Sequence, residues 1–234
     1  MILLLETSTK NCSVALVDSG LVVAAKSARG DGFIHGEQLH TFIQETLGKA
    51  GISSKDLSAV AVGKGPGSFT GLRIGVSAAK GIAFAMNIPL ISFNTLASFP
   101  AEDIDQEATH KLCVIDARRD EVYAALFTKE GSSWAPTGPV HAMIVTPESW
   151  EEALPGGAVV AVYGDCAGKV KQLKRVDSKH TWLYTEDSFP FAEKAANEVQ
   201  TKYSAGEFED VAYFEPFYLK DFQAEKSKKN PLNR

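Results

Sequence analysis

Two strand–turn–strand segments with the same pattern of residues constrain the fold of this chain more than any other feature. The segment 4–17, LLETSTKNCSVALV, aligns without gaps on the segment 114–127, VIDARRDEVYAALF. In each segment an apolar strand ends at an acidic residue, a polar turn follows, and a second apolar strand returns. Such internal similarity indicates a duplicated fold with two similar α/β halves. Two unrelated β-hairpins are the alternative interpretation.

The other apolar segments are compatible with two α/β halves. Short apolar runs bounded by glycine or polar residues predict strands, and the Ser19-Gly20 pair predicts the turn of a hairpin. Apolar residues at helical spacing predict helices, the first of which is expected to end at Gly51. The predicted strands cover residues 3–5, 12–18, 21–27, 59–63, 89–93 and 159–163, the predicted helices cover residues 37–50, 72–86 and 191–203, and an extended segment covers 216–219.

A boundary between the halves is expected within residues 101–109, where Glu, Asp and Gln accumulate and the apolar periodicity lapses. The predicted N-terminal subdomain covers residues 1–105, and the predicted C-terminal subdomain covers residues 106–223. Residues 224–234 contain several basic side chains and little apolar surface, so they are predicted to form a mobile basic tail.

The charge balance argues against a chain that is drawn to nucleic acid by its overall field. Its 24 Lys and Arg against 29 Asp and Glu give a net charge of -5 over 234 residues, so RNA contact would be local or through a partner. The three cysteines lack CxxC spacing and fit neither a disulfide framework nor a thiolate metal site. The apolar run 1–5 is too short for a signal peptide or a membrane span. A cytoplasmic location is therefore expected.

The glycine-rich loop 63–71, GKGPGSFTG, admits two interpretations. Glycines let backbone N–H groups approach an anion, and the N-terminus of the following helix would favour a phosphate. However, the loop lacks the Lys-Ser/Thr pair of a Walker A loop and the third glycine of a dinucleotide fingerprint. A tight strand-to-helix turn, with Ser68 or Thr70 as the helix N-cap, is the interpretation that the residues favour.

The helix after this loop carries small residues every four positions, at Gly71, Gly75, Ala79 and Ala83. Glycine in a helix interior costs about 0.5–1 kcal/mol relative to alanine, so two glycines indicate that another backbone approaches closely. The spacing does not distinguish the chain's own sheet from another protein. If another protein is the neighbour, Gly75→Leu or Ala79→Leu is expected to block pairing and leave the fold largely intact.

Glu6 and Asp116 end matching strands, so in a duplicated fold both carboxylates would approach one cleft between the halves. A metal–nucleotide complex could bind in such a cleft. The second turn carries Arg118 and Arg119, which would attract an anion, fill the cleft or pair with nearby carboxylates.

The histidines do not indicate a metal site. His35 and His40 lie five residues apart, about 140° around a helix, so they are not expected to ligate one ion. No Ser/His/Asp or Cys/His arrangement is evident in the sequence, and no catalytic residue is predicted.

Several of these segments resemble the TsaB/YeaZ family. The resemblance is carried by residues 5–9, 11–16, 63–75, 116–123 and 216–220. The glycine-containing segment is the most specific of them, whereas residues 137–200 contribute little. The resemblance implies a duplicated actin-like (ASKHA, RNase H-like) α/β fold with two subdomains, as in actin, hexokinase and heat-shock chaperones.

The resemblance also implies a function. Members of this family are non-catalytic partner subunits of the complex that forms N6-threonylcarbamoyladenosine at position 37 of transfer RNAs that read codons beginning with A. The implied partners are TsaD, which transfers the threonylcarbamoyl group, the ATPase TsaE, and a second copy of the chain. Transfer RNA would be contacted through the complex. No cofactor or metal would be required by the isolated chain, whereas ATP or ADP could bind in the complex.

The resemblance implies that the two helices of the first half form the interface with TsaD and with a second copy. The expected interface residues are Leu39, Phe42, Ile43, Leu47, Gly71, Leu72, Gly75, Val76, Ala79 and Ala83. A vestigial nucleotide cleft would contain Glu6, Ser8, Gly65, Gly67, Ser68, Asp116 and Arg118. The alternative function is a nucleotide-dependent kinase of the same superfold, in which Glu6 and the two turns would bind magnesium nucleotide.

Overall fold

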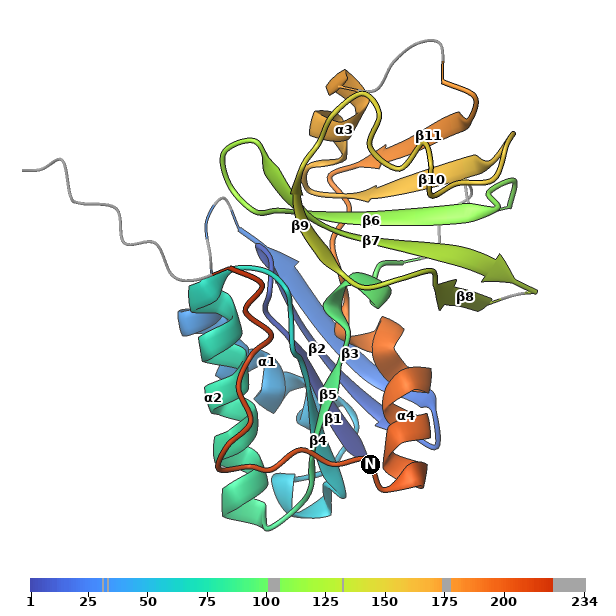
Figure 1. The fold of residues 1–234 in the computed structure, drawn as a ribbon. Helices are drawn as coiled ribbons and strands as arrows, with labels where there is room; N and C mark the ends of the chain where they lie inside the picture. The colour runs from blue at the N-terminus through green and yellow to red at the C-terminus, as the bar shows by residue number, and fades with distance from the viewer. Residues whose placement is uncertain (31, 33, 101–105, 132, 174–177, 221–234) are drawn as a thin grey trace, which may run out of the picture.

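The computed structural model describes residues 1–30, 32, 34–100, 106–131, 133–173 and 178–220. Figure 1 shows two lobes, each built around one β-sheet. Within the described residues, no helix is both long enough and apolar enough to cross a membrane. Most of the predicted boundary, residues 101–105, and the whole predicted tail, residues 224–234, lie outside the described residues.

The first sheet has the strand order β3-β2-β1-β4-β5. The β1–β2 and β2–β3 pairs are antiparallel, and the β1–β4 and β4–β5 pairs are parallel. Its strands are β1 (Ile2–Glu6), β2 (Asn11–Asp18), β3 (Leu21–Arg29), β4 (Ala59–Gly63) and β5 (Leu90–Phe93). Ser19 and Gly20 both have positive φ between β2 and β3, which confirms the predicted hairpin turn. Every residue of β1 and β4 is buried because both faces of the sheet are covered.

Alternate residues of β1 point into two different cores. Leu3 and Leu5 contact the core beneath α1 (His35–Lys49) and α2 (Phe69–Met86), whereas Ile2 and Leu4 face the opposite core. The opposite core is completed by η4 (Ala192–Ala195) and α4 (Ala196–Ala205). In Figure 1, α1 and α2 lie on one side of the first sheet and α4 lies on the other.

The second sheet has the order β11-β10-β6-β7-β8, and β9 also pairs with β7. Its elements are β6 (His110–Asp116), β7 (Glu121–Glu130), β8 (Ser133–Pro136), β9 (His141–Ile144), β10 (Val159–Gly164), α3 (Ala167–Leu173) and β11 (Thr181–Glu186). The β6–β7 pair is antiparallel, and the β6–β10 and β10–β11 pairs are parallel. This pattern matches β1–β2, β1–β4 and β4–β5 of the first sheet. The two halves therefore share one topology, as the sequence repeat predicts.

The predicted C-terminal subdomain, residues 106–223, does not remain together in space. Ala195, Ala196 and Val199 pack beneath the first sheet, in the same core as Ile2 and Leu4 of β1. The physical reason is that the first sheet is apolar on both faces and needs a second cover, which the end of the chain supplies. The predicted helix 191–203 is correct in place, although its first turn is the 3-10 segment η4.

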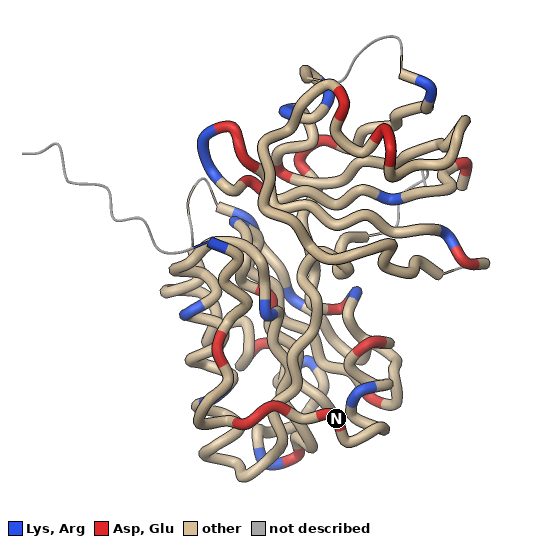
Figure 2. Tube along the Cα trace, in the orientation of Figure 1, with Lys and Arg blue, Asp and Glu red and all other residues tan. Residues whose placement is uncertain are grey.

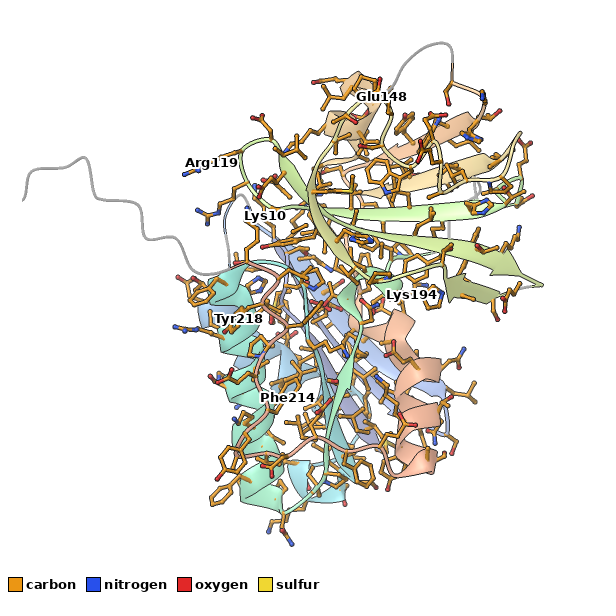
Figure 3. The ribbon with its side chains drawn as sticks, viewed as in Figure 1. Lys10, Arg119, Glu148, Lys194, Phe214 and Tyr218 are labelled. Atoms are coloured by element: carbon orange, nitrogen blue, oxygen red, sulfur yellow. The ribbon has the colours of Figure 1, made fainter. Side chains whose placement is uncertain are left out.

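After α4 the chain returns along α2 as an extended segment, residues 207–220, which we call the closing strap. Lys80 of α2 donates through Nζ to the Ala212 and Phe214 carbonyls at 3.0 and 3.1 Å. The Phe217 N–H donates to the Lys64 carbonyl at 2.8 Å. Figure 3 shows Phe214 and Tyr218 of the strap beside α2.

The small-residue stripe of α2 faces the chain's own β1–β2 turn. A Cβ on Gly71 would lie 2.1 Å from the Thr7 carbonyl oxygen, and a Cβ on Gly75 would lie 2.2 Å from Thr7 Oγ1. The Thr7 hydroxyl donates to the Gly71 carbonyl at 2.8 Å. Ala79 and Ala83 belong to the same buried core. The close backbone approach that the sequence indicates is therefore intramolecular, and leucine at Gly75 or Ala79 would overpack the core rather than merely block pairing.

Two glycines of α2 provide a matched test of this packing. We expect Gly75→Ala to destabilise the protein by about 1–3 kcal/mol, because the new Cβ collides with Thr7. Gly81→Ala should instead stabilise it by about 0.5–1 kcal/mol, since nothing lies within 4 Å of that position in the same helix. Urea unfolding of the two variants measures the difference. Equal stabilisation by both substitutions would contradict the packing described for Gly75.

Candidate functional site

The interface expected from the sequence lies inside the first half. All ten of its residues are buried, and most contribute to the core between the helices and the first sheet. The residues concerned are Leu39, Phe42, Ile43, Leu47, Gly71, Leu72, Gly75, Val76, Ala79 and Ala83. That prediction is wrong as a set of surface residues, because an apolar helical stripe packs equally well on the chain's own sheet.

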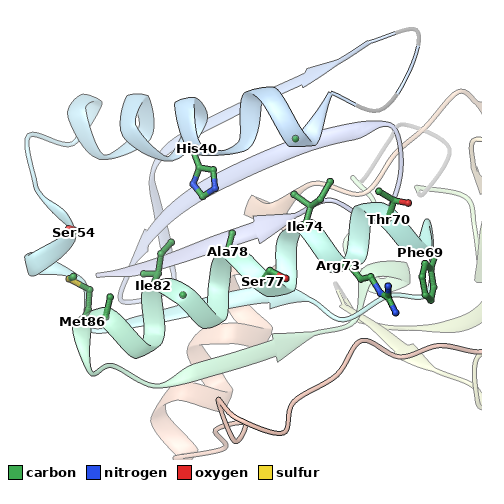
Figure 4. Close-up of a pocket in the computed structure, with 13 residues that line it drawn as sticks. His40, Ser54, Phe69, Thr70, Arg73, Ile74, Ser77, Ala78, Ile82 and Met86 are labelled. Atoms are coloured by element: carbon green, nitrogen blue, oxygen red, sulfur yellow. The ribbon is translucent and has the colours of Figure 1, made fainter.

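The other face of the same two helices is open and apolar. A groove of about 950 Å³ runs between α1 and α2, and we call it the helix groove. Ile74, Ala78 and Ile82 of α2 lie along it, while His40 of α1 projects toward α2 (Figure 4). All three α2 residues are only partly buried against the core.

A sequence signal for the helix groove exists beside the glycine stripe. Ile74, Ala78 and Ile82 recur every four residues, offset by one position from Ala79 and Ala83. A helix that is apolar on more than one side has more apolar surface than a single sheet can cover. The only charged side chains of α2 are Arg73 and Lys80. Most of the surface of this helix is therefore uncharged along its whole length.

The apolar surface continues around α2 toward the closing strap. A second hollow of about 680 Å³ is lined by Lys80, Gly81, Phe84 and the strap residues 210–212. It shares Gly81 with the helix groove. Phe84 is 83% exposed, although phenylalanine residues are usually buried. Exposed apolar surface of this extent is typical of a site that another molecule covers.

The glycine-rich loop is packed against the β1–β2 turn and forms a turn rather than an open cradle. The Ser68 N–H donates to the Ser8 carbonyl at 2.7 Å, and a Cβ on Gly67 would lie 2.4 Å from the same oxygen. Ser68 accepts from the Gly71 N–H at 3.2 Å and is the N-cap of α2, as predicted. The Gly65 N–H donates to Thr95 at 3.2 Å.

Glu6 is enclosed in this packed region. Its Oε1 accepts from the Ser8 N–H at 2.7 Å, and its Oε2 accepts from the Thr95 hydroxyl at 2.9 Å. The side chain is fully buried, and burial raises its pKa above the ordinary value, although the bonds from Ser8 and Thr95 act in the opposite direction. Gly63 is required here because a Cβ would lie 2.1 Å from Glu6 Oε2. Glu6 therefore joins three segments of the first half and does not face an open cleft.

The matching turn of the second half is open. Asp116 accepts from Lys169 Nζ and from the Arg118 N–H, and its own N–H donates to Asp165 Oδ1. Burial raises the pKa of Asp165, whereas the hydrogen bond from the Asp116 N–H and, to the smallest extent, the charge of Lys10 in the first half lower it. Figure 2 shows charges of both signs at this turn, and Figure 3 shows Lys10 between the lobes.

The expected cleft residues therefore divide into two groups. The structure brings together Glu6, Ser8, Gly65, Gly67 and Ser68 in the first half, and Asp116 with Arg118 in the second. Because the Glu6 carboxylate is occupied by Ser8 and Thr95, a magnesium nucleotide shared between Glu6 and Asp116 is not favoured. This arrangement counts against the kinase alternative.

The two clustered histidines, His35 and His40, lie in different environments. His35 is buried, with Nε2 2.6 Å from the Thr9 carbonyl oxygen, and burial lowers its pKa. His40 lines the helix groove. Among the described residues, no group of three or more His, Cys, Asp and Glu side chains is placed to hold a metal ion.

Comparison with known proteins places this architecture in a family. Residues 33–152 match the family model described as TsaD, tRNA N6-adenosine threonylcarbamoyltransferase. The chain is 38% identical over 130 residues to the tRNA threonylcarbamoyladenosine biosynthesis protein TsaB of Escherichia coli, covering 55% of each chain. The structure of YeaZ from Pseudomonas aeruginosa superposes with a TM-score of 0.74 at 27% identity, over 93% of this chain and 99% of that one. The chain belongs to the TsaB/YeaZ family.

Membership of the TsaB/YeaZ family confirms the predicted duplicated actin-like fold, whose two matched sheets are described above. A similar TsaB of Haemophilus influenzae is 34% identical over 130 residues, covering 55% of this chain and 54% of that protein. The aligned region spans about half the length of the curated TsaB relatives.

The enclosure of Glu6 predicts a pH-dependent stability. Because burial raises the folded-state pKa above the ordinary 4.5, this group contributes fully below about pH 4.5 and its contribution is lost as pH rises through the folded pKa. Glutamine stays neutral at every pH, so Glu6→Gln should gain stability relative to the wild type as pH rises from 4.5 to 8. Urea unfolding across this range measures the difference. Glu207→Gln, at an exposed position, is the control. If the difference in stability between Glu6→Gln and the wild type stays constant across this pH range, the raised pKa of Glu6 is wrong.

Proposed function

We propose that this chain is a non-catalytic accessory subunit in the formation of N6-threonylcarbamoyladenosine at position 37 of transfer RNAs that read codons beginning with A. The support from the comparisons is the name that the curated relatives carry, tRNA threonylcarbamoyladenosine biosynthesis protein TsaB. The observation that carries the accessory role is the open helix groove, an apolar surface suited to a protein partner. The occupied carboxylate of Glu6 is consistent with a subunit that does not perform the chemistry.

The proposed direct partner is TsaD, and the proposed contact is the helix groove rather than the buried residues expected from the sequence. The family model that matches residues 33–152 is that of TsaD, so a TsaD subunit would present a related helix pair to α1 and α2. Packing of helix on helix through apolar ridges is a common way to bury such a surface. A second copy of this chain would use the same groove in the absence of TsaD.

The remaining members of the complex are assigned by the same proposal. TsaE would join once TsaD is bound, and transfer RNA would be contacted through the complex, since a net charge of -5 provides no general attraction for RNA. ATP or ADP would be bound by the complex, with no cofactor required by this chain alone. The cytoplasm is the compartment that this role requires.

Size-exclusion chromatography with light scattering tests the proposal. We expect the chain alone to form a homodimer and to exchange into a stable heteromer when TsaD from the same organism is added. A chain that remains unchanged in mass on addition of TsaD would overturn the accessory role and return attention to nucleotide binding.

A pair of tryptophan substitutions tests the position of the interface. Ala85→Trp places a large ring at an exposed position of the helix groove, so it should weaken TsaD binding by about 10-fold or more through steric exclusion. Ala205→Trp makes the same change at the exposed end of α4, on the other side of the first sheet, and should leave binding unchanged. Isothermal titration of TsaD into each variant gives the affinities. Equal binding by both variants would place the interface elsewhere.

A further inference from the structure

One end of the helix groove carries a charge in otherwise uncharged surroundings. Among the described residues, Arg73 is the only Lys, Arg, Asp or Glu side chain that lines the groove. Figure 4 shows Arg73 beside Phe69 at this end, with Ile74 and Ala78 farther along α2. An isolated cation at the end of an apolar surface gives a partner one point of polar recognition.

Arg73 is held in one orientation by two aromatic side chains. Its guanidinium carbon lies 4.0 Å from the centre of the Phe69 ring, within the range of a cation–π contact. Its Nε donates to the Tyr218 hydroxyl at 3.3 Å, and the Phe69 and Tyr218 rings are 5.0 Å apart. The Phe69 ring against the guanidinium face and the hydrogen bond from Nε therefore hold the guanidinium in place, although Arg73 is an exposed residue.

The remaining donors of Arg73 are available to a ligand. Within the described part of the chain, the contacts of its guanidinium are those with Phe69 and Tyr218, and both leave the terminal Nη groups without an acceptor. A guanidinium presents its N–H groups as a planar fork that matches the two oxygens of a carboxylate. Because the plane is already fixed, little side-chain freedom is lost when such a carboxylate binds.

We propose that Arg73 recognises an aspartate or glutamate side chain on the partner subunit, at the end of the apolar helix surface that fills the groove. This inference rests on the proposed function, and it specifies the partner's surface: apolar residues against Ile74, Ala78 and Ile82, and one carboxylate at Arg73. Tyr218 is a positioning residue, because it holds the guanidinium and leaves its Nη groups to the partner. The closing strap thereby contributes to the interface through Arg73.

The surroundings of Arg73 favour a carboxylate over a nucleic-acid phosphate. Binding of an RNA backbone normally uses several cations along a groove, whereas Arg73 is the only Lys or Arg among the described residues that line this groove. A single carboxylate needs only one arginine fork. The ion pair would become partly desolvated as the groove is covered, which strengthens it relative to an exposed pair.

Substitutions at Arg73 test the proposal with TsaD as the binding probe. Arg73→Met keeps much of the side-chain stem and removes the fork, so we expect TsaD binding to weaken by about 10-fold. Arg73→Lys should recover part of the loss, since lysine keeps the charge without the bidentate geometry. Tyr218→Phe should weaken binding by a smaller factor, because it releases Nε and leaves the ring contact in place. Isothermal titration at low and high salt should give a weaker salt dependence for Arg73→Met than for the wild type.

Arg29→Met is the matched control. Arg29 also lies over a phenylalanine ring, that of Phe189 at 4.9 Å, and pairs with Asp187, but it does not line the helix groove. Its loss changes the net charge equally, so any general effect of charge would appear in both variants. Thermal unfolding of every variant verifies that the fold is retained.

The outcomes separate this inference from the proposed function. If Ala85→Trp blocks TsaD binding while Arg73→Met binds as the wild type does, the groove is the interface and the carboxylate contact is wrong. If wild-type chain does not bind TsaD at all, the proposed function fails and the inference fails with it. If Arg73→Met weakens only the self-association of this chain, the groove's occupant is a second copy, which also overturns the inference. Weakened TsaD binding by Arg73→Met, with partial recovery by Arg73→Lys, supports it.

Discussion

The close approach of α2 to the β1–β2 turn determines how the rest of the first half is arranged. Thr7 donates to the Gly71 carbonyl and lies against Gly75, while Ser68 at the N-terminus of α2 is bonded to the Ser8 carbonyl. These contacts require glycine at position 71, where two backbones meet, and at position 75, where a Cβ would collide with the Thr7 side chain. Since the small residues of α2 face inward, its isoleucines are left on the side toward α1. The helix groove is therefore a consequence of the same packing that fixes the helix.

The two halves share a topology but use their matching turns differently. In the first half, Glu6 is enclosed by Ser8 and Thr95, and the glycine-rich loop packs directly on the turn. In the second half, Arg118 adopts positive φ in a turn that stays open to solvent, and Asp116 pairs with Lys169. The buried Glu6 carboxylate, whose two oxygens already accept hydrogen bonds, has a structural role. The open, charged turn of the second half is not sufficient by itself to form a nucleotide-binding site. The two halves are therefore more alike in the topology of their sheets than in the contacts made by their matching turns.

The closing strap connects features that belong to separate parts of the molecule. It pairs with β5 at Glu209, crosses α2 at Lys80, and places Tyr218 on the residues at one end of the helix groove. At its far end, Lys220 donates to the Ala117 carbonyl and forms an ion pair with Glu121 of the second half. Val211 and Phe214 of the strap also pack against the core beneath α2, so apolar contacts and bonds to carbonyls and carboxylates together fix its course.

Much of the architecture follows from the sequence alone. The repeat of strand, acidic residue, turn and strand predicts the two matched halves, and Ser68 is predictable as an N-cap because a serine precedes the helix at the required place. The sequence does not predict strands β8, β9 and β11 or helix α3, because none of them has the continuous buried apolar run of β1 and β4. The return of α4 to the first sheet depends on contacts between residues far apart in the sequence, such as Asn11 with Pro190, which are 179 positions apart.

The sequence by itself determined which residues of α2 share a face, because helical periodicity depends only on spacing along the chain. It also determined that a backbone must approach Gly71 and Gly75. Only the tertiary structure decided that this backbone is the chain's own β1–β2 turn, and that Glu6 is enclosed rather than open to a cleft. The physical reason is that a stripe of small or apolar residues gains similar packing against any complementary surface, so its neighbour is set by which segments the folded chain brings together.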